Sequence, residues 1–108
     1  SKGVIIMLTI KIPMLSNFSL GLLVCTNRIN DKIEQDNKFK KFVEESLARY
    51  TSSDWGDTCN EDVKMNNDAI RNGDRILAVY TQKNTDVTIW IITEWDRSVT
   101  TILFPNEY

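Results

Sequence analysis

The most regular hydrophobic pattern lies near the C-terminus of the chain. Residues 87–94 and 99–104 are rich in β-branched and aromatic side chains, which favour a pleated, buried surface. The four residues between them, 95–98, are polar apart from Trp95. Two β-rich runs joined by a short polar connection predict a β-hairpin.

Three other segments also have the pattern of strands. Residues 4–12 are apolar with polar interruptions, residues 18–26 are apolar on both faces near their end, and residues 75–82 alternate. An apolar pattern on both faces is typical of an inner strand. A turn is predicted at residues 83–86, and Pro105 is expected to end the last strand.

A helix is predicted from residue 38 to residue 50, with Asp36 or Asn37 as its cap. Its apolar stripe at helical spacing consists of Phe39, Phe42, Val43, Leu47 and Tyr50. Before it, Asn30 or Asp31 is expected to cap a helical turn.

A second helix is predicted to begin at Thr58, where Glu61 completes a capping box. Gly73 is expected to end this helix as a left-handed cap. Residues 66–68 are poor helix formers, so we expect the helix to be held by docking.

Strands and helices are therefore segregated along the chain, in the order β(β)-α-α-β-β-β. This order predicts an α+β fold: an antiparallel sheet of four to five strands with two helices packed on one face. The 108 residues suit a single domain. Residues 1–17 form either an extension of it or an edge strand.

Composition narrows the chemistry more than the fold. The net charge of −2 does not favour general binding to nucleic acid or anionic membranes, and no apolar run is long enough to span a membrane. The chain has no histidine, which removes the commonest general base and zinc ligand. Its two cysteines, Cys25 and Cys59, are predicted to be buried free thiols. Nothing in the sequence predicts a metal or a cofactor.

Acidic residues gather between positions 54 and 74. This acidic segment contains Asp54, Asp57, Glu61, Asp62, Asp68 and Asp74. Its ordinary interpretation is a solvated helix face. The alternative is a surface that imitates a nucleic-acid backbone, in which charges recur every ~3.4 Å along each strand.

Polar residues also gather at the predicted hairpin tip. Glu94, Asp96 and Arg97 are either a carboxylate pair with a phosphate-binding arginine or a turn held by local hydrogen bonds. A divalent metal held by Asp54, Asp57 and one tip carboxylate is a further alternative, although the spacing matches no specific metal motif. The residues alone favour the structural interpretation.

Four blocks of sequence resemble a group of small proteins carried by phages, plasmids and integrative elements of Gram-positive bacteria. The blocks are residues 26–33 (TNRINDKI), 42–47 (FVEESL), 54–57 (DWGD) and 89–108 (IWIITEWDRSVTTILFPNEY). Some anti-CRISPR proteins against type II-A systems look like members of this group. The group supplies no catalytic residues that can be carried over.

The resemblance implies an inhibitor of host CRISPR immunity that acts in the bacterial cytoplasm as a monomer or homodimer. Its partner would be a Cas9 effector or the Cas9–guide RNA complex, which holds nucleic acid in a positively charged channel. The expected contact surface combines the acidic segment and the hairpin tip: Asp54, Asp57, Glu61, Asp62, Asp68, Glu94, Asp96 and Arg97.

Two other functions stay open. One is a small Mg²⁺-dependent nuclease or RNA-directed factor that uses Asp54, Asp57, Glu94, Asp96 and Arg97. The other is a plasmid-borne adaptor protein unrelated to CRISPR, which dimerises through an exposed sheet edge.

Overall fold

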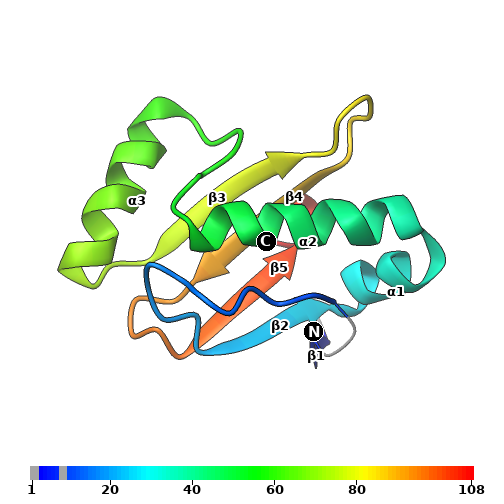
Figure 1. Cartoon of the computed structure of the whole chain (residues 1–108), viewed down its shortest axis with the longest axis horizontal. Helices are drawn as coiled ribbons and strands as arrows, with labels where there is room; N and C mark the ends of the chain where they lie inside the picture. The colour runs from blue at the N-terminus through cyan, green and yellow to red at the C-terminus, as the bar shows by residue number, and fades with distance from the viewer. Residues whose placement is uncertain (1–2, 8–9) are drawn as a thin grey trace.

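A five-stranded sheet forms the centre of the molecule, with its strands in the order β1-β2-β5-β4-β3 (Figure 1). The structure is a computed structural model that describes residues 3–7 and 10–108. The strands are β1 (Val4–Ile6), β2 (Leu22–Thr26), β3 (Ile76–Thr81), β4 (Thr88–Thr93) and β5 (Val99–Leu103). The predicted α+β class and the strand count are confirmed, and of the two alternatives for residues 1–17, β1 forms an edge strand.

The predicted hairpin is also confirmed. β4 and β5 pair antiparallel, with Trp90 opposite Leu103 and Thr93 opposite Thr100. β3 pairs antiparallel with the other side of β4, so β3, β4 and β5 form a meander. This follows from the β-branched and aromatic composition of all three segments.

The expectation of a wholly antiparallel sheet is wrong at one position. β2 runs parallel to β5, with Leu22 opposite Val99 and Cys25 opposite Ile102. Three helices carry the chain from the end of β2 to the far edge of the sheet, and the meander then returns. The meander reverses direction twice, between β3 and β4 and between β4 and β5, so β5 lies beside β2 and runs in the same direction.

Residues 3–7 and 10–108 contain three helices, one more than the sequence predicts. They are α1 (Asn27–Gln35), α2 (Asn37–Thr51) and α3 (Asn60–Asn72), and a short 3-10 turn, η1 (Pro105–Glu107), follows β5. The extra helix is α1, which begins directly at the end of β2. Asn30 and Asp31 lie inside it, and its cap is Thr26, whose Oγ1 accepts a hydrogen bond from the Ile29 amide.

α2 is the predicted 38–50 helix, and it lies across one face of the sheet (Figure 1). The Asp36 carboxylate caps it by accepting a hydrogen bond from the Phe39 amide at 3.1 Å. The apolar stripe is buried as predicted, with Phe39, Val43, Leu47 and Tyr50 completely inaccessible and Phe42 partly buried. The helical spacing of these residues therefore identified the core side of α2.

α3 lies alongside β3 at the sheet edge instead of across the helix-covered face (Figure 1). The predicted capping box is absent: α3 begins after Cys59 and has no side-chain cap, because the Thr58 hydroxyl donates to the Trp55 carbonyl and accepts from the Val79 amide. Gly73 ends the helix with φ at 73°, as predicted.

The outer edge of β3 is closed by side chains and a single backbone bridge at Val79 instead of by a strand. The Asn66 amide group both accepts from the Leu77 N–H at 3.2 Å and donates to the Leu77 carbonyl at 2.8 Å. The Val79 N–H donates to Thr58 Oγ1, and the Val79 carbonyl accepts from the Asp57 N–H. The Thr81 N–H donates to the Asp57 carboxylate. Docking of α3 thus rests in part on Asn66, which the sequence marked only as a poor helix former.

Gly56 makes the close approach to this edge feasible. Its φ is +61°, and a Cβ there would lie 2.4 Å from the Tyr80 ring and 2.7 Å from the Val79 carbonyl oxygen. Glycine alone accommodates both the backbone conformation and the distance.

The two cysteines have opposite environments. Cys25 is buried as predicted, and that burial, followed by the nearby Glu107 carboxylate, raises the pKa of its thiol to about 11. Cys59 is exposed, so the prediction of a second buried thiol is wrong. It lies just before α3, on the side of the chain that faces solvent.

Replacing Asn66 by alanine should destabilise the protein by about 1–3 kcal/mol, because it leaves both Leu77 backbone groups without partners. Urea denaturation measures the change in the free energy of unfolding. Asn72→Ala, at the exposed end of α3, is the matched control and should change stability by less than about 0.5 kcal/mol. Equal effects of the two substitutions would contradict the role given to Asn66.

Thiol titration at pH 8 should modify one cysteine in the native protein and two in denaturant. The raised pKa and burial keep Cys25 protonated and inaccessible, whereas Cys59 is open to the reagent. Cys59→Ser should remove the native reaction entirely. Rapid modification of that variant without denaturant would show that Cys25 is accessible.

Candidate functional site

The eight candidate contact residues lie around α3 and at both ends of β3. Asp57 lies at the Thr81 end of β3, whereas Glu94 directly follows Thr93, which pairs with Ile76 at the other end. The six residues of β3 place these two ends about 16 Å apart. The candidate residues of the acidic segment and of the hairpin tip therefore border the same helix, but the structure does not bring them to one point.

Asp54 and Asp57 are largely engaged by the scaffold. The Arg49 guanidinium donates two hydrogen bonds to the Asp54 carboxylate, at 2.9 and 3.2 Å, and this pairing lowers the pKa of Asp54. Asp54 also accepts from the Gly56 amide. The Asp57 carboxylate accepts from the Thr81 N–H at 2.8 Å. Both residues therefore fix the loop that closes the edge of β3.

Trp55 anchors the same loop to the core. Its ring is buried and packs edge-on against Tyr50 at a centroid distance of 5.5 Å. Its Nε1 donates to the Asn67 side chain at 2.8 Å, and the Tyr80 hydroxyl donates to the Asp54 carbonyl at 2.7 Å. The DWGD block is thus a structural element that joins α2, α3 and β3.

The outward face of α3 carries alternating charges. With Asn66 and Ala69 buried against β3, helical geometry places Glu61, Lys64, Asp68 and Arg71 on the opposite side. Asp68 forms an ion pair with Arg71 at 3.0 Å. The face therefore contains two acidic and two basic residues, a weaker imitation of a nucleic-acid backbone than the sequence suggested.

Glu61 and Asp62 are the candidate carboxylates of α3 that the scaffold does not use. Both are exposed in the first turn of α3, and neither side chain makes a hydrogen bond or ion pair within residues 3–7 and 10–108. The N-terminal end of a helix stabilises negative charge, which accounts for their position without a partner.

At the hairpin tip, Asp96 has the local role that the structural interpretation expects. Its Oδ1 accepts from the Ser98 hydroxyl at 2.6 Å and from the Ser98 amide at 3.0 Å. These bonds lower the pKa of Asp96, and the Ser98 hydroxyl is the main cause. Glu94 contributes mainly through its backbone, which pairs with Val99 and accepts from Arg97.

Arg97 holds the hairpin tip against the end of α3. Its Nη2 donates to the Ala69 carbonyl at 2.8 Å, and its Nη1 donates to the Asp74 carbonyl at 2.7 Å and the Glu94 carbonyl at 3.1 Å. The Ala69 carbonyl lies in the last turn of α3, where it also accepts from the Gly73 and Asp74 N–H groups. Both terminal nitrogens of the guanidinium are thus occupied by protein carbonyls, which leaves little of it for a phosphate.

Trp95 is a feature of the tip that the site prediction omitted. Its side chain is 66% exposed. Tryptophan is enriched among the residues that contribute most to binding at protein interfaces, so an exposed tryptophan marks a candidate contact. The sequence signal that could have identified Trp95 is that it is the one apolar residue in the polar connection 95–98.

The carboxylates do not assemble into the centre that the nuclease hypothesis needs. Asp54 and Asp57 lie at one end of β3, and Glu94 and Asp96 lie at the other. Over the described residues, no three cysteine, aspartate or glutamate side chains form a group that could hold a metal ion.

The adaptor hypothesis requires an open sheet edge, and β1 is the candidate. One side of β1 pairs with β2, and Val4 and Ile6 are 56% and 51% exposed. The strand has three residues, so the edge is short. The opposite edge, at β3, is closed by Asp57, Thr58 and Asn66.

No family model, curated protein or solved structure matches this chain. Across residues 3–7 and 10–108, no helix has the length and apolarity needed to cross a membrane.

Arg97→Ala should lower the free energy of unfolding by about 1.5–3 kcal/mol, because charge-assisted bonds to several carbonyls are lost. Arg97→Lys should recover only part of this loss, since an ammonium group cannot reproduce the planar fork. Urea denaturation gives both values.

Arg71→Ala is the matched control, because Arg71 makes a single exposed ion pair with Asp68 and should contribute less than about 1 kcal/mol. If Arg97→Ala is no more destabilising than Arg71→Ala, the structural role of Arg97 is wrong.

Proposed function

We propose that this protein is a non-catalytic inhibitor encoded by a mobile element, which binds a type II-A Cas9 effector or its guide RNA complex. The proposal rests on the resemblance of residues 26–33, 42–47, 54–57 and 89–108 to small mobile-element proteins. The observation that favours binding over catalysis is the use of the polar candidates as scaffold. Asp57, Asp96 and Arg97 each bond to the protein's own backbone.

The proposed contact surface extends along α3. Glu61 and Asp62 lie at its first turn, and Arg97 holds the hairpin tip with Trp95 at its last turn. Thirteen helical residues span about 20 Å. That length fits within an interface of standard size, about 800 Å² per partner.

The alternating charges on this surface favour specific ion pairing over imitation of a phosphate backbone. Glu61 and Asp62 would meet basic residues of the effector, while Lys64 and Arg71 limit attraction to any other cationic groove. Trp95 would supply the apolar anchor that a charged rim needs. The alternating pattern on α3 thus serves selectivity for one partner.

Reversing the two unengaged charges of the first turn of α3, Glu61→Lys with Asp62→Lys, should weaken binding to Cas9 or its guide RNA complex by about tenfold or more. Surface plasmon resonance at two salt concentrations measures affinity, and DNA cleavage by the effector measures inhibition. The matched control is Glu34→Lys with Glu45→Lys, which makes the same charge change at exposed positions of α1 and α2. Equal losses in both double variants would rule out α3 as the contact surface.

Wild-type protein that neither binds nor inhibits the effector would refute the proposed function itself. Guide RNA cleaved by the pure protein with Mg²⁺ would instead favour the nuclease alternative.

A further inference from the structure

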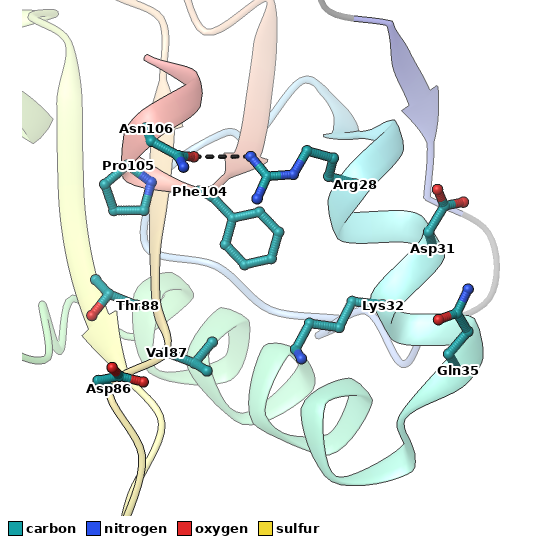
Figure 2. A pocket seen from close by; sticks show the side chains of 10 residues that line it. All are labelled: Arg28, Asp31, Lys32, Gln35, Asp86, Val87, Thr88, Phe104, Pro105 and Asn106. Carbon is teal, nitrogen blue, oxygen red and sulfur yellow. Dashed lines mark hydrogen bonds between the residues drawn. The ribbon is translucent and has the colours of Figure 1, made fainter.

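A groove opens between α1, the start of β4 and the C-terminal turn η1 (Figure 2). Its volume is about 640 Å³, within the range of small-molecule sites. The residues that matter most for its chemistry are Arg28, Lys32, Asp86, Val87, Phe104 and Asn106. None of them belongs to the proposed α3 surface.

The walls of this groove are joined to one another by hydrogen bonds. Thr26, the cap of α1, donates through Oγ1 to the buried Glu107 carboxylate at 2.9 Å, and Glu107 also accepts from the Phe104 amide. Arg28 Nη1 donates to Asn106 Oδ1 at 2.9 Å. Helix and turn are therefore fixed relative to each other without a ligand, which lowers the cost of binding one.

Two cationic side chains extend into the groove from α1. The Arg28 guanidinium lies 5.0 Å from the centroid of Phe104, and Lys32 Nζ lies 5.3 Å from the centroid of Phe39. The two residues are four apart, so they share one face of the helix. Asp31 and Gln35 of α1 also line the groove, at the rim farther from Phe104 (Figure 2), so the two cations share the lining with two carboxylates, Asp31 and Asp86.

Both cations keep hydrogen-bonding capacity. The bond to Asn106 is the one hydrogen bond of the Arg28 guanidinium within residues 3–7 and 10–108, out of five N–H groups that a guanidinium carries. Lys32 is 3.8 Å from Asp36, but both side chains are about two-fifths exposed, so the pair is weak.

The charged side chains that line the groove indicate which class of ligand it binds. Two adjacent cations match a phosphate monoester, which carries about −1.5 to −2 at pH 7, better than a carboxylate. On the opposite wall, Asp86 repels an anion but accepts hydrogen bonds from hydroxyl or amino groups. Val87 and Phe104 provide the apolar floor between them (Figure 2).

We propose that this groove binds a small organic phosphate monoester that also carries hydroxyl or amino donors, of the class of nucleoside monophosphates. The phosphate lies against Arg28 and Lys32, and the donor groups face Asp86. This site is independent of the α3 surface, and its failure would leave the proposed inhibitor function intact.

Isothermal titration of the full chain with AMP, adenosine and inorganic phosphate tests the proposal. AMP should bind, adenosine should bind at least about tenfold more weakly, and inorganic phosphate should also bind more weakly than AMP. Equal binding of AMP and adenosine, or no binding of AMP at millimolar concentration, would overturn it.

Lys32→Gln is the decisive variant, because Arg28→Gln also breaks the bond to Asn106 that holds the turn. It should weaken AMP binding by about tenfold and leave the melting temperature unchanged. Lys38→Gln, an exposed cation of α2 outside the groove, is the matched control and should bind AMP normally. Wild-type affinity in Lys32→Gln would refute the site.

Discussion

The unpaired side of β3 sets the constraint on which the arrangement of this protein depends. The outward N–H groups of Leu77, Val79 and Thr81 face no neighbouring strand, and backbone groups without partners are costly when covered. Asn66, Thr58 and Asp57 supply the missing partners from α3 and the loop before it. A sheet edge that would otherwise be open to another chain is thereby closed within the molecule.

This closure determines what the polar residues of the chain can do. Asp57 bonds to Thr81, Asp54 bonds to Arg49 and Gly56, and Arg97 joins the hairpin tip to the last turn of α3. Residues that a sequence suggests as catalytic are therefore engaged in holding one helix and one loop in place. Glu61, Asp62 and Trp95 remain exposed around the same helix. The proposed contact with another macromolecule rests on these exposed residues.

Much of the fold could be predicted because its signals are local. The strand composition of residues 87–94 and 99–104 and the helical spacing of Phe39 to Tyr50 each follow from side-chain burial on one element. The parallel pairing of β2 with β5 could not be predicted, because it depends on where three helices deliver the chain. α1 was missed because Thr26 ends a strand and caps a helix at the same residue.

The candidate site was predicted only in outline. The acidic residues around α3 were identified, but the partners of Asn66 and Arg97 are 11 and 28 residues distant, and no sequence periodicity relates them. Thr58 has the sequence of a capping box, yet the need of the Val79 amide for an acceptor takes precedence. The Arg28–Lys32 groove could not be predicted, because the C-terminal turn completes it only in three dimensions.

Native-state hydrogen exchange at the Leu77, Val79 and Thr81 amides tests the central claim most directly. If α3 and its preceding loop close the edge of β3, these three amides should exchange orders of magnitude more slowly than exposed amides. Leu77 and Val79, which lie deepest under this cover, should approach the protection of amides in the inner strand β4. Exchange of all three at the rate expected for an open edge would contradict the account.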